Sequence, residues 1–186
     1  FWRQTAQDPV LGTALEGTPQ ALARELPTLL RAPLKPDRPV LGPAPDFAAA
    51  VQALRAEHAQ HRAQAELDMQ QAYGADKLSK RSYKPDTIET AFAALDAFLL
   101  APDKDTLPVF THLAHSQIAT KGGHAAPENP LLHALDDWRV FCERQAQFND
   151  DRRLALWHAL RGFAGAALAA HKAEQGLLGY DDLITQ

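Results

Sequence analysis

The segment between Asp76 and Pro85 gathers the side chains of this chain that are best suited to contact a polyanion. Its basic, hydroxyl and aromatic residues are Lys77, Ser79, Lys80, Arg81, Ser82, Tyr83 and Lys84. Lysine and arginine attract phosphates, serine hydroxyls add hydrogen bonds, and a tyrosine ring can stack on a base. A second patch is expected at Lys121 with His124, on a glycine-rich segment. The candidate DNA-binding residues are therefore Lys77, Lys80, Arg81, Tyr83, Lys84 and Lys121.

A structural reading of the same segment stays open at this point. Lysines at a turn between helices can simply be solvated, and Tyr83 can belong to the core. The formal net charge of the 186-residue chain is −4, so it does not attract nucleic acid as a polycation. Any DNA contact has to come from a local patch.

The histidines are the candidate metal ligands. His58 and His61 are three residues apart, as are His112 and His115, and this spacing can present two imidazoles to one ion. A third ligand would have to come from His124 or from a carboxylate elsewhere, and no cysteine partner is at hand. We therefore interpret them as ordinary surface histidines and expect no metal site.

Motifs for nucleotide hydrolysis or DNA cleavage are missing from the sequence. No glycine loop ends in Gly-Lys-Ser/Thr, and no Asp-Glu pair follows an apolar strand. The adjacent acidic pairs suit solvated faces and helix ends; they are Asp136-Asp137, Asp150-Asp151 and Asp181-Asp182. The lone Cys142 lies on an apolar helical face and is expected to act as a small hydrophobe. We expect no catalytic residue and no cofactor in this chain.

The hydrophobic pattern predicts an all-α, irregular helical domain with long antiparallel helices and no substantial sheet. A proline-rich connection over 32–45, with room for one short strand at Val40-Leu41, should separate a short helix over 18–30 from the rest. The first predicted helix after it spans 47–73 and is capped by Asp46. The next is capped by Asp86, with Glu89 completing a capping-box-like start, and ends at Pro102. A third runs from Pro108 and ends before Lys121, and the last spans 130–176, with Asn129 as N-cap and Pro130 at the first helical position. The first of these is polar enough to project as an arm. The last should break or bend at Asn149-Asp150-Asp151.

Several short segments resemble the beta subunit of exodeoxyribonuclease V, the family of RecB-type helicase–nucleases. They follow the same order as in that family and extend over nearly the whole chain. The opening of the family's inserted domain is similar to Phe1-Trp2-Arg3, and its basic loop to Leu78-Ser79-Lys80-Arg81-Ser82-Tyr83-Lys84. A further family segment resembles Phe110, Lys121-Gly122-Gly123, Pro127 and Pro130-Leu131. The sequence that leads into the family's ATPase core resembles Lys172, Gly176 and Gly179-Tyr180-Asp181-Asp182-Leu183-Ile184. The chain departs from the family at two places. Asn129 stands where relatives often have a histidine, and Ala173-Glu174-Gln175 stands where they often have a basic run.

The resemblance implies that residues 1–176 are the inserted accessory domain, known as 1B, and that 177–186 return toward the first motor domain. Both ends then look cut from a longer, cytoplasmic, nucleoid-associated protein. In the family this region contacts duplex DNA ahead of the junction. It also packs against the gamma subunit, and the same complex contains an alpha subunit. The parent protein would use ATP and magnesium as a 3′→5′ DNA helicase and exonuclease in double-strand-break repair and recombination. The alternative is a helical module that docks a partner subunit without touching DNA, and neither reading involves a membrane.

Overall fold

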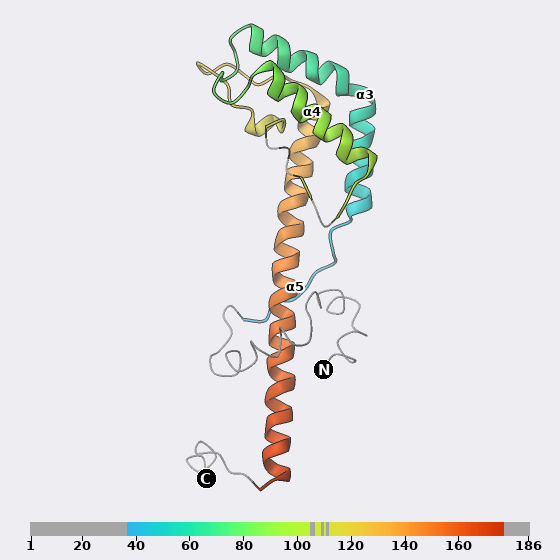
Figure 1. Ribbon diagram of the computed structural model, residues 1–186, viewed down its shortest axis with the longest axis vertical. Helices are drawn as coiled ribbons and strands as arrows, with labels where there is room; N and C mark the ends of the chain where they lie inside the picture. The colour runs from blue at the N-terminus through green and yellow to red at the C-terminus, as the bar shows by residue number, and fades with distance from the viewer. Residues whose placement is uncertain (1–36, 105–106, 109, 111, 177–186) are drawn as a thin grey trace. The chain divides into compact units, whose positions relative to one another are not determined.

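The computed structural model describes residues 37–104, 107–108, 110 and 112–176. In this part of the chain the elements are α3 (Phe47–Gly74), α4 (Pro85–Leu100), the 3₁₀ turn η2 (His115–Gln117) and α5 (Pro130–Glu174) (Figure 1). The described residues contain no strand, only an isolated bridge between Leu78 and Thr120. The all-α prediction is confirmed.

The chain divides into two units. Unit 1 consists of Phe1–Pro43 and Gln147–Gln186, and unit 2 is Ala44–Ala146. Helix α5 contributes its first turns to unit 2 and the remainder to unit 1. The predicted boundary at residue 176 stays a prediction, because 177–186 lie outside the described residues.

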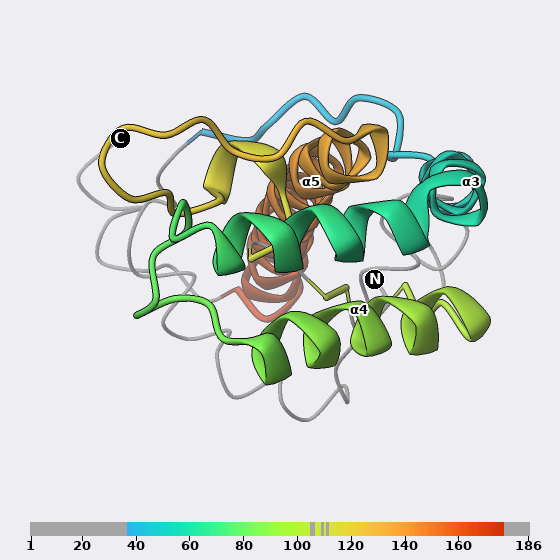
Figure 2. The same ribbon diagram turned by 90° about the horizontal axis from the view of Figure 1, so that it is seen from above.

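Helix α3 begins where the sequence predicts. The carboxylate of Asp46 accepts a hydrogen bond from the backbone N of Ala49 at 3.0 Å, as an N-cap does. The helix does not project as an arm, however. Apolar residues from both halves of the helix enter the core, and they are Val51, Leu54, Ala65, Met69 and Ala72. Its second half lies antiparallel beside α4 (Figures 1 and 2). The sparse apolar stripe after Arg55 is therefore sufficient for packing.

Helix α4 begins at Pro85, one residue before the predicted cap Asp86. Pro85 occupies the first helical position, where its fixed φ and missing N–H are no disadvantage. The preceding Lys84 is extended, as a residue before proline prefers, and its backbone N donates to Thr87 Oγ1 at 2.8 Å. Thr87 thus has the role that we assigned to Glu89, and Asp86 lies in the first turn.

Charged side chains join α3 to α4 along a line that we call the α3–α4 seam, made of His58, Arg62, Glu66 and Asp96. Arg62 donates to Asp96 Oδ2 at 2.8 Å, and His58 Nε2 lies 2.6 Å from Asp96 Oδ1. Arg62 also pairs with Glu66 and lies 5.5 Å from the centre of the Phe92 ring. Burial opposes ionisation of Asp96, but the hydrogen bonds from Arg62 and His58 outweigh it and lower the pKa of this carboxyl. Every member of the seam has an ionic partner.

The core of unit 2 contains a group of aromatic rings between the three helices. Trp138 of α5 lies 5.2 Å from both Phe98 and Phe141, measured between ring centres, and 6.3 Å from Phe47. Its indole N donates to the carbonyl of Pro108 at 2.8 Å, which satisfies the one polar atom of the ring. This packing fixes the first turns of α5 against α3 and α4.

The start of α5 confirms the prediction from Asn129-Pro130. Asn129 is 3 % exposed, and its side-chain oxygen accepts from the backbone N of Leu131 at 3.0 Å. Its amide N donates to Asp68 of α3 at 2.9 Å, so one side chain caps α5 and ties it to α3. The predicted interruption near Asn149 is wrong, since residues 149–151 remain helical. Gln147 and Arg153 hydrogen-bond Asp151 and Asp150 within the helix. Gly176, at φ +64°, follows the end of α5 as predicted.

The predicted helix from Pro108 to Lys121 is also wrong. The described part of this segment holds one 3₁₀ turn, η2, between extended residues. Leu113, Ala114 and Ile118 are buried in the core, and Thr120 must be extended to pair with Leu78. Tertiary contacts therefore override the local helical pattern.

The described residues of unit 1 pack in their own small cluster. Ala155 and Leu156 of α5 are buried, with Leu41 and Ala159 against them. Residues 37–46 form a connection without regular secondary structure, as predicted, but Val40 and Leu41 form no strand and Val40 is fully exposed. The helix predicted over 18–30, Phe1-Trp2-Arg3 and Gly179–Ile184 lie outside the described residues. No helix in the described ranges has both the length and the apolar character that a membrane crossing requires.

Candidate functional site

The two segments in which the sequence predicted DNA contacts lie side by side in unit 2. The backbone N of Ser79 donates to Ala119 O at 2.9 Å, and the N of Lys121 donates to Lys77 O at 2.8 Å. Between these bonds the side chain of Leu78 is fully buried. Residues 77–79 and 119–121 are therefore held in a fixed register, and the two patches become one.

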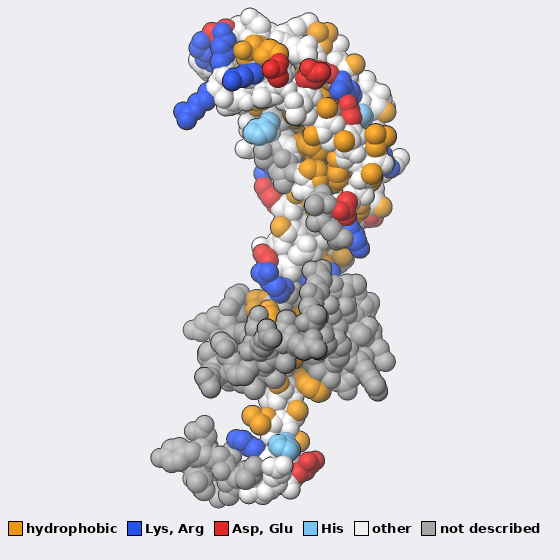
Figure 3. All heavy atoms as spheres, viewed as in Figure 1, with side chains coloured by type: hydrophobic (Ala, Val, Ile, Leu, Met, Phe, Trp, Pro, Cys, Tyr) orange, Lys and Arg blue, Asp and Glu red, His pale blue; other side chains and the backbone are white. Residues whose placement is uncertain are grey.

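We call the resulting patch the basic surface; its residues are Lys77, Lys80, Arg81, Lys84 and Lys121. All five are exposed. Figure 3 shows Lys and Arg side chains gathered, with an acidic side chain beside them, at the end of unit 2 that carries the α3–α4 loop. The turn after Lys121 uses Gly122 and Gly123 at φ +63° and +75°, a backbone region that favours glycine.

Asp76 is the carboxylate within the basic surface. Lys80 Nζ lies 2.9 Å from its Oδ1, and Lys121 pairs with its Oδ2. The hydrogen bonds from Lys121 and Lys80 lower the pKa of Asp76 to about 2. Asp76 has φ +56°, a left-handed conformation that aspartate tolerates better than most residues. One carboxylate thus pairs with two of the five cations.

The other three cations of the basic surface are Lys77, Arg81 and Lys84. Among the residues that the structure describes, none of them forms an ion pair with a carboxylate. Their charges are presented to solvent on a backbone that the paired segments hold in place. This is the arrangement that non-specific phosphate contacts need.

Tyr83 is not part of the basic surface. Its side chain is 3 % exposed, and its hydroxyl donates to the carbonyl of His112 at 2.8 Å. Burial raises the pKa of this phenol. A ring enclosed in this way cannot stack on a base, so the stacking role that we predicted for Tyr83 is wrong and its packing role replaces it.

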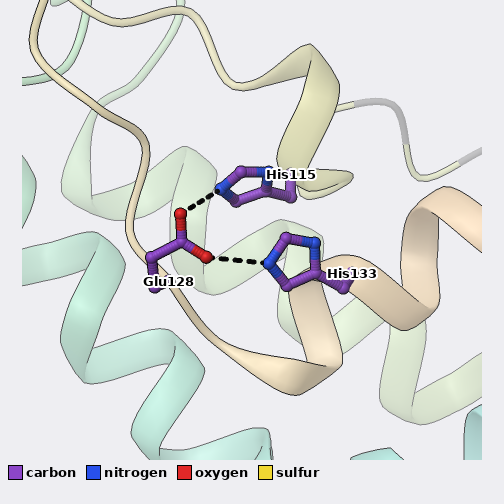
Figure 4. A group of neighbouring side chains, drawn as sticks. All are labelled: His115, Glu128 and His133. Atoms are coloured by element: carbon purple, nitrogen blue, oxygen red, sulfur yellow. Dashed lines mark hydrogen bonds and ion pairs between the residues drawn. The ribbon is translucent and has the colours of Figure 1, made fainter.

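A second cluster of unit 2 was not predicted from the sequence. His115 of η2, Glu128 and His133 of α5 place one ligand atom each within 4.8 Å of the others (Figure 4). His133 Nε2 lies 2.9 Å from Glu128 Oε2, and His115 Nε2 lies 3.4 Å from Glu128 Oε1. The two imidazole rings face each other with centres 4.1 Å apart. The hydrogen bond from His133, followed by the charge of His115, lowers the pKa of Glu128.

The neighbouring elements fix this cluster. Asp136 of α5 accepts hydrogen bonds from the backbone N and the hydroxyl of Ser116, at 3.1 and 2.6 Å, which holds η2 against α5. The acid that we interpreted as part of a solvated face thus positions His115. The histidine pairs considered from spacing do not converge: His58 binds Asp96, His61 lies 3.5 Å from Glu57, and His112 is outside the cluster.

Groups for covalent catalysis are not assembled in the described residues. Cys142 is buried, and burial, with the charge of Glu143, raises the pKa of its thiol to about 11. An open hollow of about 490 Å³ adjoins both the basic surface and the histidine cluster, and its polar lining residues are Asp68, Gln71, Lys77, His124 and Glu128. Its lining holds no nucleophile beside a base.

Comparisons of the chain with protein-family models, with curated proteins and with solved structures found no match. The likeness to RecB-type proteins therefore rests on the order of the sequence landmarks, and the functional argument rests on the geometry of unit 2.

Proposed function

We propose that this chain is a helical accessory domain that contacts duplex DNA through the basic surface and belongs to a RecB-type helicase–nuclease. One observation carries the proposal: residues 77–79 and 119–121, far apart in sequence, pair and bring Lys121 to the cations of the α3–α4 loop. The landmarks shared with the family support the same assignment.

The chemistry of the basic surface determines the kind of binding. Lysine and arginine provide phosphate contacts, and buried Tyr83 offers no ring for a base. Affinity should therefore depend little on DNA sequence and fall steeply with salt, because released counterions supply the free energy of binding. With a net charge of −4, the chain should bind weakly on its own. The domain would steady the duplex while ATP hydrolysis and strand cleavage take place elsewhere in the parent protein.

Charge reversal at the unpaired cations tests the proposal. In Arg81→Glu/Lys84→Glu both substituted side chains are exposed and have no described ion pair, so the fold should be unaffected. The matched control is Arg144→Glu/Arg153→Glu, which changes the net charge equally on the exposed surface of α5. Binding of a fluorescent duplex at low salt should weaken about tenfold or more in the first variant and much less in the control.

Two results would contradict the proposal. One is a wild-type chain that does not bind duplex at low salt. The other is an equal loss of affinity in both double variants, which would mean that net charge alone matters. Either result would favour the module that docks a partner subunit without DNA contact.

A further inference from the structure

We propose that His115, Glu128 and His133 bind a divalent transition-metal ion, and that zinc fits this ligand set best. Two histidines and one glutamate are a known three-ligand set for zinc, with a fourth position left to water or another ligand. The inference rests on unit 2 alone and is independent of DNA binding.

The distances within the cluster suit one small ion. Zinc bonds to nitrogen and oxygen of ~2.0–2.1 Å in a tetrahedral site place neighbouring ligand atoms ~3.4 Å apart. Glu128 Oε2 lies 2.9 Å from His133 Nε2, and its Oε1 lies 3.4 Å from His115 Nε2. With one ligand atom taken from each residue, the three atoms all lie within 4.8 Å of one another. Both Nε2 atoms point toward the carboxylate in Figure 4. Small side-chain rotations would complete the geometry.

His115 gives the second, independent observation. Its Nε2 is closed off from solvent, and its described partner is Glu128 Oε1 at 3.4 Å, a contact that does not meet hydrogen-bond geometry. A buried polar atom without a hydrogen bond is uncommon in folded proteins and calls for a partner. A metal ion between His115 and Glu128 would supply that partner.

The surroundings make the site both preformed and accessible. Asp136 holds η2 through Ser116, and His133 lies in the first turns of α5 behind the Asn129 cap, so two ligands are on fixed elements. Glu128 and His133 are 73 % and 50 % exposed, so an ion can enter directly from solvent. Bound metal would connect η2, the residue before the α5 cap and α5 itself.

Calorimetric titration of the full chain with zinc chloride tests the site, with any polyhistidine tag removed first. The wild type should bind one zinc ion per chain. Glu128→Gln and His133→Asn should each weaken binding about 100-fold, because loss of a residue that only hydrogen-bonds a metal ligand already costs about 10–100-fold. The control His112→Asn removes a histidine three residues from His115 that is outside the cluster, and it should bind as the wild type does.

Cobalt(II) gives a readout that a merely structural role would not change. A site with few ligands should produce visible absorption bands when cobalt binds the wild type and His112→Asn, and none with Glu128→Gln. Because Glu128 is exposed, this substitution should leave the circular dichroism spectrum unchanged. No zinc binding by the wild type, or equal affinity in wild type and Glu128→Gln, would overturn the proposal and leave the trio as a hydrogen-bonded cluster.

Discussion

The α3–α4 seam and the basic surface use the same kinds of side chain for opposite purposes. In the seam, the carboxylates of Asp96 and Glu66 pair with the charge of Arg62, and Asp96 also hydrogen-bonds His58. On the basic surface, Asp76 pairs with Lys80 and Lys121. Lys77, Arg81 and Lys84 form no ion pair with a carboxylate of the described residues. Charge is neutralised where two helices must be held together, and it stays in excess on an exposed loop. The excess of positive charge, rather than the number of cations, distinguishes the surface that can bind a polyanion.

The largest effect should come from breaking the seam. Arg62→Ala removes the guanidinium that bonds Asp96, pairs with Glu66 and covers the Phe92 ring. We expect the free energy of unfolding to fall by about 2 kcal/mol, measured by urea denaturation. DNA affinity should not change, because the seam presents no excess charge. A stable variant with weaker DNA binding would invalidate the comparison.

Tyr83→Phe separates packing from DNA contact at the edge of the basic surface. The change removes the hydroxyl that bonds the carbonyl of His112 and should cost about 1 kcal/mol of stability. Affinity for duplex DNA should stay the same, since the ring is buried. A clear loss of affinity with unchanged stability would return Tyr83 to the set of DNA contacts.

The seam should also depend on pH. The pKa of Asp96 is lower in the folded chain than the unfolded value of about 3.9. Its contribution is therefore complete at neutral pH and disappears as the pH falls from about 4 through the lowered pKa. Asp96→Asn should cost about 1 kcal/mol at pH 7. The difference in unfolding free energy between wild type and variant should shrink as the pH falls below about 4 and vanish once the pH is below the lowered pKa of Asp96. A difference that persists in acid would mean that the carboxylate charge is not what stabilises the seam.

The smallest effect should come from releasing the two paired lysines of the basic surface. Asp76→Asn removes the carboxylate between Lys80 and Lys121 without a change of size. Affinity for duplex DNA should rise about two- to threefold at low salt, because one repelling charge is lost. Stability should hardly change, because exposed ion pairs contribute little to it. Weaker DNA binding would show instead that Asp76 orients the lysines for their contacts.

Local signals in the sequence were sufficient for the main helices. Asp46 and Asn129 predicted the starts of α3 and α5, because a cap depends on residues close in the chain. The cap of α4 was missed because Glu89 was preferred over Thr87, although Pro85 favours the earlier start. The helix predicted after Pro108 was wrong because burial of Leu113 and pairing of Thr120 decide that segment.

The candidate sites depended on contacts between distant residues. The candidate DNA contacts were identified from charge in the sequence, but the pairing of Leu78 with Thr120, which joins the two patches, could not be predicted from it. The histidine cluster was missed because spacing paired His115 with His112 and left the third ligand to His124 or an unidentified carboxylate. Glu128 and His133 lie close to His115 because the segment between them folds back, and a helical pattern in the sequence does not reveal such a contact. One signal was available: His133 lies one turn into a helix whose cap, Asn129, follows directly after Glu128.

The salt dependence of DNA binding tests the central claim most directly. Three unpaired cations predict that the logarithm of the binding constant falls with the logarithm of salt concentration with a slope of about −3. In Arg81→Ala/Lys84→Ala the slope should decrease to about −1, while Arg144→Ala/Arg153→Ala should keep the wild-type value. Equal slopes in all three proteins would contradict the account, because the basic surface would then not be where the phosphates bind.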